Sequence, residues 1–272
     1  MKILCLDGGG VFGDLQADVL SGVDALDKFD CFVGTSIGSA ISAAIALGKQ
    51  NEVSTSFFHS KMPVVFKKSL LRYYWPFNSK YSDKGLNNTL QDVFGGNLLK
   101  DAKKPLFVTA ANVGSRTLKV FNSTENGWLL WEVIRCATAA ETYFPSWKGY
   151  ADGGVFANNP SMVGVAAAAR MLGAKIEELE VLSIGTGDRT GRGSRGPRSI
   201  FRWGVWLIDA LLDGASDKMH DYFVRSMPLK KYKRIQFPCR SGWKMDSPAD
   251  MLEAEKVLRA DLDRAAKIVE AF

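Results

Sequence analysis

The feature of this sequence that most constrains its fold is a serine held between two glycines, in the run FVGTSIG at residues 32–38. The apolar residues before it are typical of a buried strand, and the small and apolar residues 40–47 predict a helix. G-x-S-x-G between a strand and a helix describes a nucleophile elbow, in which Gly34 and Gly38 must lack side chains and Ser36 lies at the tip. The helix then points its first N–H groups at this tip. A glycine- and serine-rich turn without chemistry is the alternative interpretation.

Length and composition favour one large α/β domain over residues 1–272, since 46% of the residues are hydrophobic. No segment approaches the roughly 20 apolar residues of a membrane span. The amino-terminal apolar run stops at Asp7, which is too short for a signal peptide, so we expect a cytoplasmic protein. The net charge of +6 favours an anionic partner such as lipid headgroups, nucleotides or nucleic acid, and a merely soluble basic domain is equally compatible.

Cysteine and histidine usage argues against a metal or a cofactor. The chain has no CxxC and no HExxH, and it has only two histidines. Two of the cysteines lie in apolar, strand-like runs, which indicates buried thiols rather than disulfides or metal ligands. The four cysteines are Cys5, Cys31, Cys136 and Cys239.

A second glycine motif follows the first predicted strand, which is expected to be buried and parallel over residues 2–6. The run DGGGVFG at 7–13 leads into a helical pattern through Leu26, and such glycine clusters build nests of N–H groups for anions. Gly8, Gly10 and Gly13 also satisfy G-x-G-x-x-G, so a non-catalytic or dinucleotide-binding α/β protein is the alternative. That motif needs an acidic residue after the second strand, where this chain has the serine elbow. We therefore favour an oxyanion hole at Gly8, Gly9 and Gly10.

The third motif is YADGGVFANNP at residues 150–160. Gly153 and Gly154 place Asp152 in a tight turn, and Asn159 followed by Pro160 predicts the start of a helix. Four consecutive alanines at 166–169 would let that helix pack closely on a sheet. An aspartate between glycines is most often a turn former, but its occurrence together with the serine elbow and the glycine nest favours a functional role.

The identity of the catalytic base follows from what the chain lacks. A serine hydrolase usually pairs its serine with a histidine. Neither His59 nor His220 follows a strand in a position that would face the elbow, so Asp152 is the remaining candidate. In this interpretation Asp152 takes the Ser36 proton, the glycine nest holds the oxyanion, and water hydrolyses the acyl-enzyme. An aspartate needs a partly desolvated site for this task.

Several further segments have open interpretations. The basic and aromatic run at 67–81 suits a membrane surface, a nucleotide-stacking site or a packed loop. Residues 200–212, with Trp203 and Trp206, are apolar on nearly all sides and predict foremost a buried helix, with an interface or a lid as alternatives. We expect 188–272 to be mainly helical, although 232–237 is strand-like. A loop before it is a candidate for anion binding or a solvated loop, and carries Arg189, Arg192, Arg195, Arg198 and Arg202.

These motifs, in this order, resemble those of the patatin-like phospholipases. The segments ATAAETYFP at 137–145 and SIGTG at 183–187 also resemble family segments, so the likeness covers residues 2–187. It implies a three-layer α/β/α sandwich with a mostly parallel sheet, and phospholipase A-type hydrolysis of membrane phospholipids by a Ser36–Asp152 dyad without a metal cofactor. Phe12 stands where the family often has a basic residue, and Glu141 where it usually has proline.

The resemblance also implies partners. Some bacterial family members are defence effectors that degrade membrane phospholipid once a cyclic nucleotide binds. The arginine-rich loop and the 67–81 run make an antiviral role with a cyclic-nucleotide or other anionic activator an expectation here. We also expect transient, peripheral contact with the membrane, and we leave homo-oligomerisation open.

Overall fold

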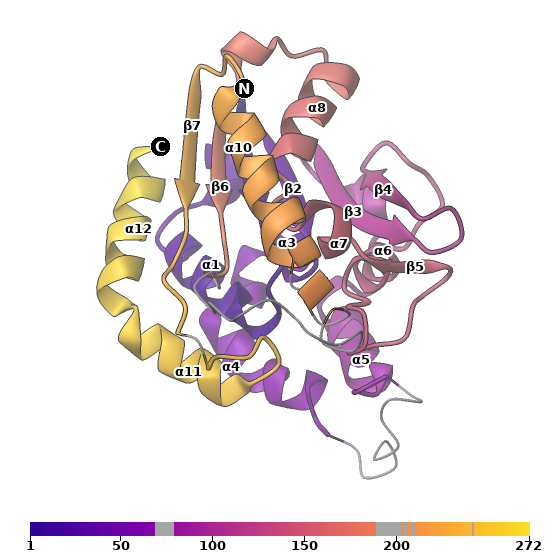
Figure 1. Cartoon of the computed structure of the whole chain (residues 1–272). Coiled ribbons are helices and arrows are strands. Elements are labelled where there is room, and N and C mark those ends of the chain that lie inside the picture. Colours follow the sequence, from indigo (N-terminus) through magenta and orange to yellow (C-terminus); the bar gives the residue numbers. More distant parts are fainter. Residues whose placement is uncertain (69–78, 189–202, 204–205, 208–209, 241) are drawn as a thin grey trace.

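The structure is a computed structural model that describes residues 1–68, 79–188, 203, 206–207, 210–240 and 242–272. Its centre is one seven-stranded sheet in the order β4-β3-β2-β1-β6-β7, with β5 paired to β3 (Figure 1). Neighbouring strands are parallel except at β4 and β5, which are antiparallel to β3. The strands are β1 (Lys2–Leu6), β2 (Cys31–Thr35), β3 (Leu106–Asn112), β4 (Thr117–Asn122), β5 (Tyr150–Asp152), β6 (Glu180–Ile184) and β7 (Lys231–Ile235).

Helices cover both faces of the sheet. The α-helices are α1 (Gly13–Leu20), α2 (Ala25–Lys28), α3 (Ile37–Leu47), α4 (Thr55–Val65), α5 (Asp83–Phe94), α6 (Leu130–Ala137), α7 (Gly154–Ala157), α8 (Ser161–Met171), α10 (Met219–Ser226), α11 (Pro248–Val257) and α12 (Arg259–Ala271). A π-helix, η6 (Ala210–Lys218), runs into α10. Short 3₁₀ turns are η1 (Gly10–Phe12), η2 (Gln50–Val53), η4 (Leu99–Asp101) and η5 (Ile176–Glu178).

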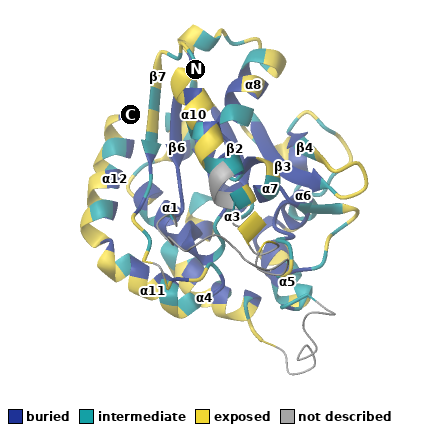
Figure 2. Ribbon diagram, in the orientation of Figure 1, coloured by how far each residue is buried: buried dark blue, intermediate teal, exposed yellow. Residues whose placement is uncertain are grey.

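Two apolar cores lie on opposite faces of the sheet, because successive side chains of a strand point to opposite faces. In β1, Leu4 and Leu6 join the larger core, which also contains side chains of α1, α3 and α12. Ile3 and Cys5 join the smaller core under α8 and α10. Figure 2 shows the buried strands between helices whose outer faces are exposed. The predicted three-layer α/β/α sandwich with a mostly parallel sheet is confirmed.

The details of several elements follow or depart from the sequence predictions. The helical pattern expected through Leu26 ends at Leu20, where Ser21 and Gly22 form a turn before α2, since glycine is a poor helix former. The alanine-rich helix packs closely as predicted: a Cβ on Gly164 would lie 3.0 Å from the Cys5 sulfur. The part from 188 onward is not helical throughout, because β7 pairs with β6 and extends the central sheet.

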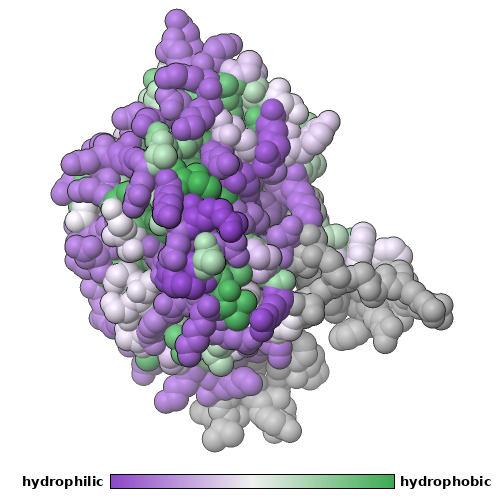
Figure 3. All heavy atoms as spheres, turned by 90° about the vertical axis from the view of Figure 1, so that its left-hand side faces the viewer, coloured by the Kyte–Doolittle hydropathy of each residue, from purple (hydrophilic) through white to green (hydrophobic). Residues whose placement is uncertain are grey.

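The surface predictions were partly wrong. At the described positions of the 200–212 segment, the prediction of burial is wrong: both indoles, of Trp203 and Trp206, are nearly half exposed, as are Leu207 and Leu211. The side of the molecule that carries α12 is mainly hydrophilic (Figure 3), as expected of helices that bury only one face. Most of the 67–81 run, and the arginines at 189–202, lie outside the described residues. No helix in the described part of the chain is long and apolar enough to span a bilayer.

Candidate active site

The serine elbow has the strained geometry that its sequence predicts. Ser36 stands between β2 and α3 with φ 51° and ψ −125°, a conformation that side-chain-bearing residues rarely adopt. Both flanking positions must be glycine because a side chain there would collide with neighbouring backbone; neither glycine has a positive φ. A Cβ on Gly34 would lie 2.5 Å from the Gly38 carbonyl oxygen, and one on Gly38 would lie 2.6 Å from that of Asp7. The turn is therefore as tight as it can be, and the serine lies at its tip.

Asp152 ends β5 and faces this serine. One of its carboxylate oxygens accepts the N–H of Gly154 at 2.8 Å, and both Asp152 and Ser36 line the same cleft. Asp152 is only 5% exposed, and this burial raises the pKa of its carboxyl to about 6, although the nearby Ser36 hydroxyl and the Gly154 N–H oppose the rise. Gly153 has an ordinary helical φ and serves close approach instead, since a Cβ there would lie 2.7 Å from the Thr109 carbonyl oxygen. Two residues far apart in the sequence are thus brought into one cleft.

A second carboxyl lies in the same cleft. Glu141 lines it together with Asp152. The pKa of Glu141 is raised to about 8, mainly by burial and secondly by the nearby Asp152 charge. The following residue, Thr142, has a positive φ of 69°. The sequence marked Glu141 only as a departure from the proline of the related segment, and nothing in the pattern placed it beside Asp152.

The glycine loop offers fewer free donors than its sequence suggests. The N–H of Gly8 already donates to the Asn158 carbonyl at 3.2 Å. Within the described part of the chain, no hydrogen bond uses the N–H of Gly9 or Gly10, and Gly10 has a positive φ of 61°. Thr186 donates its hydroxyl to the Gly8 carbonyl at 2.6 Å and so fixes the loop. Two N–H groups therefore remain for a ligand.

These elements share one cleft of about 230 Å³. Asp7, the glycine loop, Ser36 and Asp152 form its polar end. Its apolar wall comes from four parts of the chain, with Met62, Val65, Phe66, Leu86, Phe144 and Met245 among the lining residues. Neither His59 nor His220 lines it: His59 contacts Glu255, and His220 contacts the carbonyl of Asn159. A cleft of this kind can hold an acyl chain beside a serine hydroxyl.

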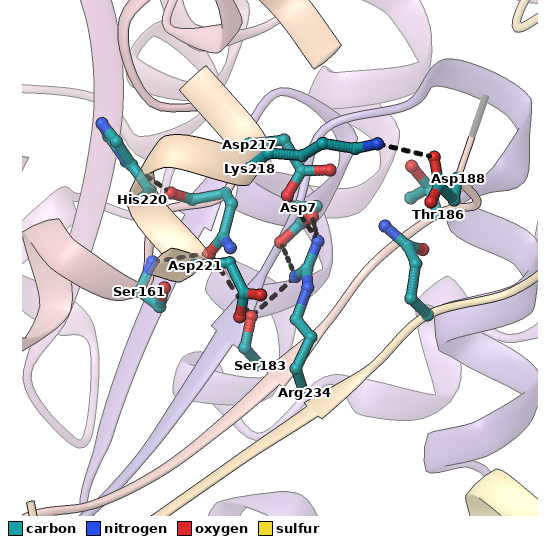
Figure 4. A network of polar contacts seen from close by, with 12 residues as sticks. Asp7, Ser161, Ser183, Thr186, Asp188, Asp217, Lys218, His220, Asp221 and Arg234 are labelled. Carbon is teal, nitrogen blue, oxygen red and sulfur yellow. Dashed lines mark hydrogen bonds and ion pairs between the residues drawn. The ribbon is translucent and has the colours of Figure 1, made fainter. Parts of the chain in front are cut away.

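Arg234 is a residue of the site that sequence reasoning missed. From β7 its guanidinium binds both carboxylate oxygens of Asp7, at 2.8 and 2.5 Å, and it also binds Asp217 at 2.8 Å (Figure 4). Burial raises the pKa of Asp7, and the Arg234 charge opposes that rise. The only sequence signal was an arginine in a short basic strand, which is also typical of an exposed edge. Asp7 precedes the glycine loop directly, so Arg234 anchors that loop.

Fold and cleft together define a class of protein: an α/β/α sandwich that presents a serine elbow, a buried carboxylate and a glycine loop at the carboxyl ends of its parallel strands. The chain belongs to the patatin-like phospholipase family, whose family model matches residues 4–165. It is accordingly a lipid hydrolase.

Curated relatives agree with this assignment. The chain is 28% identical to Protein teg of Priestia megaterium over 227 residues, which cover 78% of this chain and 70% of that protein. It is 26% identical to a cGAMP-activated phospholipase of Vibrio cholerae, over 68% of this chain and 64% of that protein. It is 28% identical to the 85/88 kDa calcium-independent phospholipase A2 of Rattus norvegicus, over 68% of this chain but only 27% of that protein.

A solved structure shares the fold. VipD from Legionella pneumophila superimposes with a TM-score of 0.54 at 11% sequence identity, covering 99% of this chain and 66% of VipD. The likeness extends over nearly the whole chain, including the part after residue 165.

Proposed function

We propose that this chain hydrolyses acyl esters of phospholipids, with Ser36 as the nucleophile and Asp152 as the general base. The observation that carries the proposal is that Ser36 and the buried Asp152 carboxyl line one cleft, close enough for the serine hydroxyl to lower the pKa of that carboxyl, beside an apolar wall. A pKa of about 6 leaves Asp152 mostly ionised at neutral pH, yet makes it a stronger base than an exposed aspartate.

The reaction would run in two steps. Asp152 accepts the hydroxyl proton while the Ser36 oxygen bonds to the ester carbonyl carbon, and the N–H groups of Gly9 and Gly10 stabilise the oxyanion. The intermediate collapses by breaking the bond to the leaving alcohol oxygen, which takes the proton from Asp152. Water, deprotonated by Asp152, then adds to the acyl carbon. The bond from that carbon to the Ser36 oxygen breaks, the fatty acid leaves, and Ser36 takes its proton back from Asp152. The apolar wall would hold the acyl chain.

A fluorophosphonate probe and lipid product analysis test this proposal. Wild type should be labelled and should release fatty acid from phospholipid vesicles, and Ser36→Ala should do neither. Asp152→Asn should lose about 10²–10⁴ in turnover, as expected for a lost general base. Ser42→Ala is the matched control, because Ser42 lies on the same helix but bonds the Val33 carbonyl away from the cleft. Absence of labelling in folded wild type would favour the non-catalytic or dinucleotide-binding alternative.

We also propose that a cyclic nucleotide activates the enzyme at a membrane in an antiviral response. Relatives named cGAMP-activated phospholipase, at 26% identity, and the net charge of +6 support this proposal. Calorimetry with a panel of cyclic di- and trinucleotides, paired with vesicle hydrolysis assays, tests it. A ligand that binds and raises hydrolysis supports activation, and an absence of binding across the panel rejects it.

A further inference from the structure

Three ionisable side chains meet away from the cleft, on three different helices. Asp14 lies in the first turn of α1, His59 in α4, and Glu255 in α11. The Nε2 atom of His59 is 3.0 Å from a Glu255 carboxylate oxygen and 3.8 Å from an Asp14 oxygen. One ligand atom from each residue lies within 4.8 Å of the other two.

Asp14 is the unusual member of this cluster. Its side chain is 0% exposed, and neither carboxylate oxygen has a hydrogen-bond partner in the described structure. A buried carboxylate without a partner is costly, and proteins pair such groups or use them to coordinate metals. Asp7, which is equally buried, shows the usual solution because Arg234 binds both of its oxygens. No arginine or lysine binds Asp14 in this way in the described structure, which leaves both of its oxygens available to a ligand.

His59 cannot fill that role by itself. Its Nε2 is already within hydrogen-bond distance of Glu255, and a separation of 3.8 Å from Asp14 is beyond a hydrogen bond. One imidazole nitrogen and two carboxylate oxygens are, however, a donor set that suits zinc. With zinc–ligand bonds of about 2.0–2.2 Å, tetrahedral ligands lie roughly 3.4 Å apart. The two distances from His59, 3.0 and 3.8 Å, lie on either side of that value.

We propose that Asp14, His59 and Glu255 bind a divalent transition-metal ion of the zinc class. The side chain of His59 is 38% exposed, which provides an entry path and room for water at a fourth position. The ion would join α1, which follows the glycine loop, to α4, whose Met62 and Val65 line the cleft. The site lies outside the Ser36–Asp152 chemistry, and its three residues share no local spacing that a sequence motif could show.

Zinc titration of the 272-residue chain, stripped with EDTA and dialysed, tests this site. Calorimetry should find one Zn²⁺ per chain, and the melting temperature should rise with added zinc, because an ion that binds only the folded state stabilises it. Loss of a residue that only orients a metal ligand weakens metal affinity roughly 10–100-fold. Asp14→Asn and His59→Gln should weaken zinc affinity by more than this, because each removes a ligand. Glu253→Gln, on the exposed face of α11, should bind like wild type.

The design separates loss of metal from loss of fold. Glu255 is 26% exposed, so Glu255→Gln should fold normally and still lose the zinc response. The proposal is overturned if wild type binds no stoichiometric Zn²⁺, or if binding survives in the Asp14, His59 and Glu255 variants. It is also overturned if only Ca²⁺ or Mg²⁺ binds, since those ions prefer all-oxygen ligands. None of these readouts depends on hydrolytic activity.

Discussion

Replacing Arg234 by methionine should damage both stability and catalysis. The Arg234 side chain is 6% exposed, and the carboxylates of Asp7 and Asp217 that it binds are 1% and 14% exposed. Removing one partner of a buried ion pair costs about 3–5 kcal/mol, because the remaining charge stays buried without compensation. Against a typical total of about 5–15 kcal/mol, Arg234→Met should lower the midpoint of urea unfolding markedly.

The matched control is a surface pair on α10. Arg225 binds Asp221 at 2.7 Å, but its side chain is 56% exposed, so Arg225→Met should cost only about 0–1 kcal/mol. The double variant Asp7→Asn with Arg234→Met also removes the more buried of the two carboxylates that lose their partner. It should therefore be more stable than the sum of the single effects by about 1–3 kcal/mol in a double-mutant cycle.

The rate of catalysis tests independently whether Arg234 anchors the glycine loop. If Arg234 positions the glycine loop through Asp7, then Arg234→Met should slow fluorophosphonate labelling and lower kcat more than it changes KM. A misplacement of about 1 Å can cost 10²-fold. The reasoning is refuted if Arg234→Met is no more destabilised than Arg225→Met, or if the folded variant is labelled at the wild-type rate.

Three further perturbations address the cleft and its surroundings. The kcat/KM should rise with pH through about 6 as Asp152 ionises. Ionisation of Glu141 should change kcat/KM a second time near pH 8, and Glu141→Gln should abolish only this second change. Because the pKa of Glu141 lies above its unfolded value, its stabilising contribution is lost as pH rises through about 8, and Glu141→Gln should flatten the pH dependence of urea unfolding. Gly38→Ala should lower both probe labelling and the melting temperature, since its methyl group would meet backbone oxygens. A Trp203→Ala, Trp206→Ala variant should sediment less with anionic vesicles and still hydrolyse a soluble ester, and unchanged sedimentation would argue against a lipid-facing surface.

Local sequence signals predicted the elbow well because its geometry is itself local. An apolar strand, a glycine on each side of Ser36 and a small-residue helix leave few alternative conformations. Strands β1 and β2 were equally recognisable, since parallel strands buried on both faces appear as continuous apolar runs. The role of the glycine after Asp152 was not inferred: Gly153 allows close approach to Thr109 of β3.

Tertiary contacts account for what the sequence could not predict. Gly8 looked like a free donor, but its N–H is used by the Asn158 carbonyl, a pairing that no local pattern encodes. Arg234 and Asp7 are 227 positions apart, and only the placement of β7 next to β6 brings them together. The exposure of Trp203 and Trp206 was likewise not predictable, because an apolar run is compatible with a core, an interface or a membrane surface.

The carboxy-terminal part of the chain holds the proposed site together, although the family model ends at residue 165. Thr186 holds the Gly8 carbonyl, and the Met245 carbonyl accepts the N–H of Val11 at 2.8 Å. Ser216 donates to the Gly154 carbonyl at 2.6 Å, next to the turn that carries Asp152. The chemistry that we propose uses groups before residue 165, but their positions depend on hydrogen bonds supplied after it. Variation in this later segment can therefore alter how the site is positioned while every motif residue stays unchanged.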